Sequence, residues 1–167
     1  IIYRYSWLKD SAPENLPVSQ TTVDAALTFK NQLWRVVVVP FDGEVEGTSS
    51  TASVKILNTP PSSAEISVDP KSPRIDDGIK VSITKPATDE DHDQLSYEYR
   101  YWINGQALNL PLSLPTIPAR ILRKSQALRV QVTTVDPEEN GGQSETQITA
   151  INTPPPAPKI VIWPAAP

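Results

Sequence analysis

The sequence contains no cysteine, no methionine and only 6 glycines among its 167 residues. Without cysteine the chain forms no disulfide, has no thiolate nucleophile and holds no cysteine-ligated zinc. The absence does not fix the compartment, because an extracellular domain with a sufficient core needs no disulfide. The sequence has one histidine, no glycine-rich phosphate loop and no HExxH pair, so nothing marks a catalytic centre and we predict that the protein is not an enzyme.

Strong charge and long apolar runs are also missing. A net charge of −4 leaves no basic surface of the kind that binds nucleic acid, so we predict no nucleic-acid partner. No apolar run is long enough to span a bilayer, which predicts no membrane insertion. The chain has no initiator methionine and no secretion signal, and we expect it to be an interior piece of a longer protein or a processed product.

Proline is abundant instead, with 18 residues, and its placement reveals a repeat. Residues 57–61 read LNTPP and residues 151–155 read INTPP, so Asn58 and Asn152 are 152 − 58 = 94 residues apart. The same offset, without a gap, superposes NLPVS (15–19) on NLPLS (109–113), Lys30 on Lys124 and many other single residues. Such self-similarity indicates an array of equal units.

The repeat predicts the organisation of the chain. Residues 61–154 form one complete unit, residues 1–60 form a partial unit without its first two strands, and residues 155–167 form the first strand of a following unit. Consecutive prolines fix φ and remove backbone donors, so we predict stiff joints at the repeated tetrapeptides. The predicted joint residues are Asn58, Thr59, Pro60, Pro61, Asn152, Thr153, Pro154 and Pro155.

Within the complete unit, apolar residues alternate with a period of two. Strands are predicted at 65–70, 78–84, 95–104, 128–135 and 145–151, with a weaker, proline-bearing strand at 116–122. Short strands at regular spacing without a helical pattern predict an all-β fold, an antiparallel two-sheet sandwich. A barrel and a disordered proline-rich linker are the alternatives, and the aromatic alternation in 95–104 argues against disorder.

Three stretches carry a family resemblance: ATDEDHDQLSYEYRYWING (87–105), LRVQVTTVDPEENGG (128–142) and NTPP (152–155). This pattern resembles the tandem immunoglobulin-like repeats of large bacterial and archaeal extracellular surface proteins, relatives of fibronectin type III, PKD and cadherin-like modules. The resemblance covers nearly the whole chain, and it implies tandem immunoglobulin-like sandwiches at the cell surface. It departs from the family pattern at Leu128, which stands where the first unit has Trp34, at Pro137 and at His92.

The acidic loop DEDHD (89–93) is the sharpest candidate site. Alternate aspartates offer several oxygens to a hard cation such as calcium, and the acidic loop near Asp136 is expected at the same end of the sandwich. The predicted calcium ligands are Asp89, Asp91, Asp93, Asp136 and Glu138. The alternative is a solvated turn, because aspartate favours turns for its own hydrogen bonds. His92, in the same loop, is expected to be solvated.

Two tryptophans are candidate binding residues. Trp102 is expected on the strand face opposite Tyr99 and Tyr101, where an exposed ring stacks on sugars or contacts a protein, or else covers a sheet edge. Trp163 lies in the apolar tail KIVIWP (159–164), which has no sandwich of its own. A partial unit 1–60 is expected to expose core positions such as Trp7, Trp34 and Val36 unless neighbouring repeats or another chain cover them.

The function predicted from these features is structural. We expect an extracellular spacer, stalk or filament-forming module, with neighbouring repeats or identical subunits as partners and with calcium stiffening its joints. Two alternatives remain open. One is an adhesion module that binds surface glycans or a protein, and the other is a subunit that polymerises by donating a β-strand through 155–167.

Overall fold

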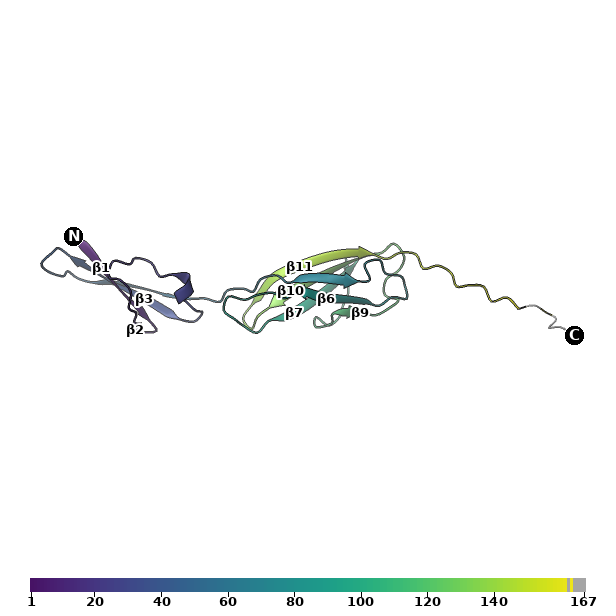
Figure 1. Cartoon of the computed structure of the whole chain (residues 1–167), viewed down its shortest axis with the longest axis horizontal. Coiled ribbons are helices and arrows are strands. Elements are labelled where there is room, and N and C mark those ends of the chain that lie inside the picture. Colours follow the sequence, from purple (N-terminus) through teal and green to yellow (C-terminus); the bar gives the residue numbers. More distant parts are fainter. Residues whose placement is uncertain (162, 164–167) are drawn as a thin grey trace. The chain divides into compact units, whose positions relative to one another are not determined.

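The structure, a computed structural model, describes residues 1–161 and residue 163 and consists of β-strands joined by irregular loops (Figure 1). By its contacts the chain divides into two units, one of Ile1–Pro60 with Asp89–Asp93 and one of Pro61–Thr88 with Gln94–Pro167. Among the described residues the helical structure is one 3-10 turn, η1 (Ala25–Leu27), capped by Asp24. No helix in this part of the chain has the length and apolar character that a membrane crossing requires.

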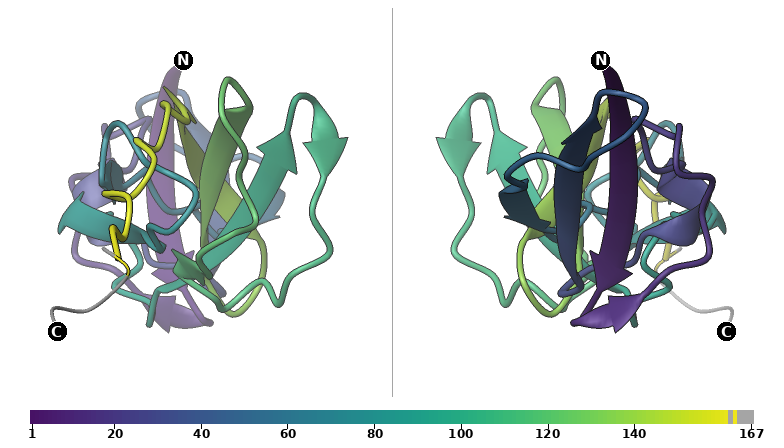
Figure 2. Two further views of the ribbon diagram at one scale, coloured as in Figure 1. Left: turned by 90° about the vertical axis from the view of Figure 1, so that its right-hand side faces the viewer. Right: turned by 90° about the vertical axis from the view of Figure 1, so that its left-hand side faces the viewer.

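The first unit contains one antiparallel sheet. Its strands, in spatial order, are β2 (Ala12–Pro13), β1 (Ile2–Lys9), β3 (Leu33–Phe41) and β4 (Ser50–Lys55). The central strands β1 and β3 pair along their whole length, from Ile2 opposite Phe41 to Lys9 opposite Trp34 (Figure 2). β4 pairs only with β3 among the described residues and is an edge strand.

The second unit contains two sheets. One has the order β11 (Asn140–Thr149), β10 (Ala127–Val135), β7 (Ser96–Ile103) and β8 (Gln106–Ala107). The other has the order β5 (Glu65–Asp69), β6 (Ile79–Lys85) and β9 (Thr116–Ile117). Alternate apolar residues of both sheets form one core, as in a β-sandwich. Its most buried members are Tyr101, Ile117, Leu128, Val130 and Val132.

The strands of the two units follow the same spacing. β1 begins at Ile2 and β7 at Ser96, and 96 − 2 = 94; β3 and β10 begin at Leu33 and Ala127, and 127 − 33 = 94. The cross-strand partners keep this spacing too, because Trp7 lies opposite Val36 and Tyr101 lies opposite Val130. The sheet of the first unit therefore has the strand pattern of the β11–β10–β7–β8 sheet.

Two details differ from the sequence predictions. The strand predicted at 116–122 is only Thr116–Ile117, because Pro118 has no amide hydrogen for a ladder and Arg120 has a positive φ of 69°. The expected exposure of Trp34 is wrong, since this side chain is 2% exposed. Trp7 meets its ring edge-on at a centroid distance of 6.4 Å, and the Lys9 ammonium lies 5.8 Å from the ring centroid.

Candidate functional site

The acidic loop between β6 and β7 forms a compact turn held by Asp89. One carboxylate oxygen of Asp89, Oδ1, accepts hydrogen bonds from the amides of Asp91 and Asp93 at 2.8 and 3.2 Å. The Asp89 carbonyl accepts from the His92 amide, and His92 is exposed with a φ of 61°. The backbone of this loop is therefore a turn closed by an aspartate side chain, whereas Asp89, Asp91 and Asp93 are only partly exposed.

A second acidic turn follows β10. Asp136 is 5% exposed, and its Oδ1 accepts from the amides of Glu138 and Glu139 at 2.7 and 2.6 Å. The equivalent residue of the first unit, Asp42, accepts from the amides of Glu44 and Val45 at 2.9 and 2.8 Å. These hydrogen bonds, the stronger from Val45, lower the pKa of the Asp42 carboxyl below its usual value, because they favour the carboxylate.

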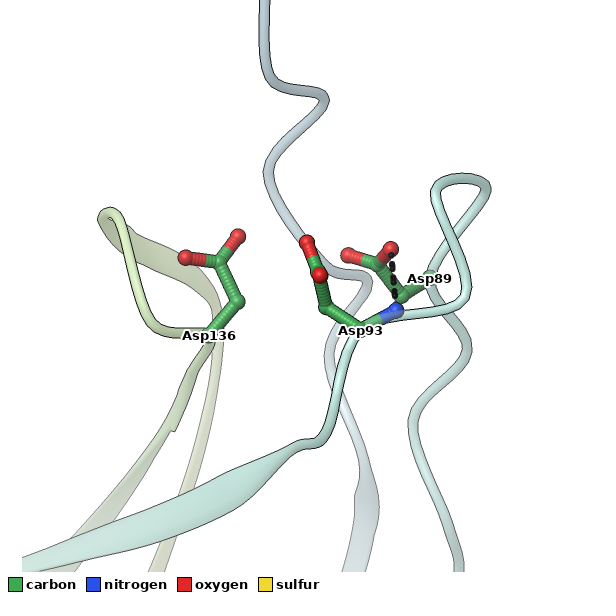
Figure 3. A group of neighbouring side chains, drawn as sticks. All are labelled: Asp89, Asp93 and Asp136. Carbon is green, nitrogen blue, oxygen red and sulfur yellow. Dashed lines mark hydrogen bonds between the residues drawn. The ribbon is translucent and has the colours of Figure 1, made fainter. Parts of the chain in front are cut away.

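Three carboxylates come together from these loops (Figure 3). One oxygen each of Asp89, Asp93 and Asp136 lies within 4.8 Å of the others. The second oxygen of Asp89, Oδ2, is buried and has no hydrogen-bond partner among the residues that the structure describes. Hard oxygen ligands at this spacing suit calcium, which takes about six to eight oxygens in total. The three clustered oxygens would fill only part of that number, and the rest would come from the second carboxylate oxygens, backbone carbonyls or water. Asp91 and Glu138, the other predicted ligands, are not members of this group.

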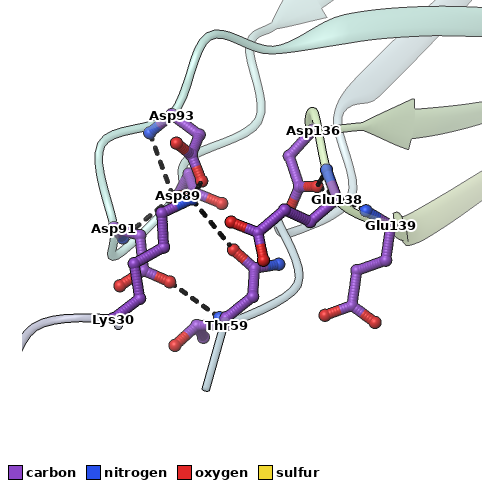
Figure 4. Close-up of polar contacts among 9 residues, drawn as sticks. Lys30, Thr59, Asp89, Asp91, Asp93, Asp136, Glu138 and Glu139 are labelled. Atoms are coloured by element: carbon purple, nitrogen blue, oxygen red, sulfur yellow. Dashed lines mark hydrogen bonds and ion pairs between the residues drawn. The ribbon is translucent and has the colours of Figure 1, made fainter. Parts of the chain in front are cut away.

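A lysine side chain already provides positive charge here (Figure 4). Lys30 of the first unit forms an ion pair with Asp93 and donates to the Asn58 side-chain oxygen at 3.2 Å. The ion pair is largely shielded, since the Lys30 and Asp93 side chains are 19% and 16% exposed. Calcium binding at this group stays a prediction, because the ammonium already neutralises one of the three carboxylates.

The first predicted joint is tied to the acidic loop. The Thr59 amide donates to the Asp91 carboxylate at 2.7 Å, and Asn58 next to it accepts from Lys30 (Figure 4). The neighbouring prolines, Pro60 and Pro61, have no amide donor of their own, so the backbone hydrogen bond of this segment to the loop comes from Thr59. The loop Asp89–Asp93 groups by contacts with residues 1–60 for this reason.

The second predicted joint has different surroundings. Thr153 accepts a hydrogen bond from the Ile75 amide at 3.3 Å, and the Ile151 amide donates to the Pro73 carbonyl at 2.8 Å. Asn152, Pro154 and Pro155 are exposed. Lys124, which lies 94 residues after Lys30, is exposed too.

The two candidate tryptophans lie in unlike surroundings. Trp102 is half-buried on β7, and the Arg129 guanidinium lies over its ring at 4.0 Å from the centroid. This cation–π contact covers one face of the ring that a sugar would stack on. Trp163 is 86% exposed. A binding role of either residue stays a prediction.

Sequence reasoning missed the role of Lys30 and Thr59 as partners of the acidic loop. Lys30 was identified only as a repeated residue, and nothing local in the sequence shows which carboxylate a lysine reaches 63 positions along the chain. The one signal that the sequence offers is the repetition of Lys30 as Lys124, each 28 residues before the asparagine of a predicted joint (58 − 30 = 28 and 152 − 124 = 28).

No protein-family model matches the chain, and no curated protein matches it either. Among solved structures, a two-domain fibronectin type III segment from chicken tenascin is 16% identical; the match covers 88% of this chain and 83% of that one, with a TM-score of 0.43. The FN1–FN3 domains of chicken CNTN1 are 16% identical over 90% of this chain and 56% of that one, with a TM-score of 0.41. Murine CEACAM1b is 10% identical over 88% of this chain and 84% of that one, with a TM-score of 0.38.

The predicted fold class is confirmed. The chain is all-β with antiparallel sheets, and in the second unit two of these sheets pack around one core.

Proposed function

We propose that this chain is a non-enzymatic structural module of an extracellular surface protein, in which sandwich units are spaced by joints of restricted bending. One observation carries the proposal: the loop Asp89–Asp93 is held by Lys30 and by the Thr59 amide at the Asn-Thr-Pro-Pro segment. A spacer needs such a joint, since flexibly linked units transmit little force or orientation.

The chemistry of these contacts supports a mechanical role. An ion pair that is four-fifths shielded is screened by salt much less than an exposed pair. Lys85 and Glu65, at 3.4 Å, form an exposed pair for comparison, with side chains 72% and 67% accessible, and such pairs contribute little. We therefore expect the Lys30–Asp93 pair to restrict motion where Lys85–Glu65 does not.

The extracellular setting is part of this proposal. Its support is the likeness of the repeat to strings of immunoglobulin-like domains in surface proteins, together with the sandwich architecture itself. Protease treatment of intact cells that make the full-length parent protein tests the setting, and a parent that stays uncleaved until the cells are lysed would contradict it.

The joint is tested with the variant Lys30→Met, and Lys85→Met is the matched control because it removes an exposed pair. We expect NMR relaxation to give coupled tumbling of the two units in the unaltered chain and in Lys85→Met. In Lys30→Met we expect the two units to tumble more independently. Independent tumbling already in the unaltered chain, or no change in Lys30→Met, would exclude a stiff joint built on this pair.

Calcium stiffening is tested on the same proteins by thermal melting with calcium and with a chelator. Replacing Lys30 by methionine leaves Asp93 without its ammonium partner, so calcium should raise the melting temperature of Lys30→Met more than that of the unaltered chain. The absence of a shift in both proteins removes calcium from the proposal and leaves the lysine-held joint as its mechanism.

A further inference from the structure

The first predicted joint continues into a segment that lies closely against β11. The Pro61 carbonyl accepts a hydrogen bond from the Gly142 amide at 2.8 Å. A Cβ on Gly141 would lie 2.2 Å from this carbonyl oxygen, and a Cβ on Gly142 would lie 2.2 Å from the Ser63 nitrogen. These distances are too short for non-bonded atoms, so a side chain at either glycine would push residues 61–64 away from β11. We call residues 61–64 the docking segment.

Space rather than backbone conformation explains the two glycines. Neither Gly141 nor Gly142 has a positive φ, whereas Gly43 and Gly105 do, at 113° and 84°. Space is not short at every glycine, because a Cβ on Gly78 would meet its nearest neighbour at 3.6 Å, an ordinary van der Waals distance. The close approach of the docking segment is therefore what requires glycine at positions 141 and 142.

Hydrogen bonds on two sides hold the docking segment on the second unit. On β11, the Ser144 hydroxyl donates to the carbonyl of Ala64, which is buried. On the other side, the Ser62 amide donates to the Thr88 carbonyl at 2.9 Å, and the Thr88 amide donates to the Ser62 hydroxyl oxygen at 2.8 Å. Thr88 directly precedes the acidic loop Asp89–Asp93, so the docking segment and this loop leave the second unit side by side.

The residue just before the prolines is held by the acidic loop instead. The Thr59 amide donates to the Asp91 carboxylate at 2.7 Å, so only Pro60 lies between this anchor and the docked Pro61. Each proline ring locks its own φ and restricts ψ of the preceding residue to extended values. Because docking fixes ψ of Pro61, the one torsion between the anchors that neither docking nor a proline restricts is φ of Thr59.

We propose that Gly141 and Gly142 are positioning residues of the joint, because they dock Pro61 on β11 and so confine bending to the link between Thr59 and Pro60. Without docking, the torsions of residues 61–64 would add to the length of chain that can bend. The inference deepens the proposed function and rests on it, since docking serves a joint of restricted bending. It assigns this restriction to both sides of the joint, with the acidic loop holding Thr59 and the glycine pair holding Pro61.

Gly142→Ala tests the proposal on the full chain, and Gly78→Ala is the matched control because a methyl group fits there. NMR relaxation measures the rotational correlation time of each unit. We expect Gly142→Ala to lose the coupled tumbling of the two units and Gly78→Ala to retain it. Hydrogen exchange of the β7 and β10 amides is measured in the same samples, because a glycine that served only the sandwich would lower this protection without uncoupling the units.

Ser62→Ala repeats the test without a steric clash. The substitution removes the hydroxyl that accepts from the Thr88 amide, and Ser62 is exposed, so the sandwich core is not disturbed. The hydrogen bond from the residue 62 amide to the Thr88 carbonyl stays in place. We therefore expect a partial loss of coupled tumbling, smaller than in Gly142→Ala.

Pro60→Ala tests whether bending is confined to the short link. Alanine releases φ of residue 60 and ψ of Thr59 while both anchors stay in place, so we expect the units to tumble more independently. Pro154→Ala is the matched control, because Pro154 takes the same position in the second predicted joint. Tumbling that Pro60→Ala leaves as coupled as Pro154→Ala would overturn the assignment of bending to this link.

The outcomes separate this inference from the proposed function. Independent tumbling in the unaltered chain contradicts the proposed function and overturns the role of the glycine pair with it. Coupled tumbling that persists in both Gly142→Ala and Ser62→Ala overturns the role of the glycine pair alone, because the joint would then be held without the docking segment.

Discussion

The two units share one strand pattern but bury it to different degrees. In the sandwich, Val130 and Val132 of β10 are 0% and 1% exposed, because the β5–β6–β9 sheet packs over them. Their counterparts on β3, Val36 and Val38, are half-buried. The same alternating sequence therefore specifies the strands in both units, while the burial of its apolar face depends on whether a second sheet covers it.

The first unit carries larger side chains at two of these equivalent positions. Trp34 takes the position of Leu128, and Trp7 takes the position of Tyr101. The two indole rings pack edge to face, with an interplanar angle of 67°, and bury Trp34 to 2% exposure. Aromatic pairs of this geometry contribute about 0.5–1.5 kcal/mol beyond their buried area. The tryptophans give the single sheet a local core that valines alone would not provide.

The largest expected effect comes from truncating one valine in each unit. Val132→Ala should destabilise the sandwich by about 2 kcal/mol, because it leaves a cavity in a closed core. Val38→Ala removes the same atoms from a half-buried site and should cost less than about 1 kcal/mol. Native-state hydrogen exchange measures the free energy of opening for each unit separately. Equal losses in the two units would mean that the β3 face is covered as completely as the β10 face.

The next largest effect should be a difference between the two units in the stability that they lose at alkaline pH. Burial raises the pKa of the Tyr101 phenol, with a smaller contribution from Tyr99, while Trp7 at the equivalent position does not ionise. The folded sandwich favours the neutral phenol, so this stabilisation is complete below the unfolded pKa of about 10 and is lost as pH rises toward the folded value. We expect the sandwich to lose stability above pH 10 more steeply than the first unit, as measured by urea unfolding at each pH.

Tyr101→Phe is the control for this alkaline effect. It removes the ionisable group together with the hydrogen bond from the Tyr101 hydroxyl to the Leu114 carbonyl, 2.7 Å long, at a cost of about 1 kcal/mol. The variant should therefore be less stable at neutral pH but less sensitive above pH 10. If Tyr101→Phe lost stability above pH 10 as steeply as the unaltered chain, the alkaline effect would come from other groups.

The sequence predicted the fold because its signals are local. Alternation in 95–104 and 128–135 marks β7 and β10 to within a residue or two at either end. The failures involve contacts between distant residues: the burial of Trp34 depends on Trp7, and the partner of Asp93 is Lys30. Period-two patterning states which side chains share a face, but it does not state what lies opposite that face.

For the candidate site, the sequence predicted that two acidic loops lie at one end of the sandwich. One carboxylate oxygen each of Asp89, Asp93 and Asp136 lies within 4.8 Å of the others. The ammonium of Lys30 was not expected there, because a flexible side chain reaches several acceptors and only the folded backbone selects one. Calcium ligation by these carboxylates accordingly remains a prediction.

The smallest expected effect compares the two aspartate turns. Asp42 and Asp136 occupy equivalent positions and each accepts two backbone amides, but Asp42 is exposed and Asp136 is buried. The pKa of Asp42 is lowered in the folded unit, so its ionised side chain stabilises the fold above the unfolded pKa of about 3.9, and this stabilisation is lost as pH falls through the folded pKa.

Asp42→Asn removes this ionisable group. We therefore expect the free energy of unfolding of the first unit to fall less between pH 6 and pH 3 in Asp42→Asn than in the unaltered chain. The effect should be small, because Asp42 is exposed to solvent. The measurement is urea unfolding of the first unit at pH 3 and at pH 6, followed through the exchange-protected amides of β3. An acid dependence that Asp42→Asn leaves unaltered would mean that the Asp42 turn forms no better in the folded unit than in the unfolded chain.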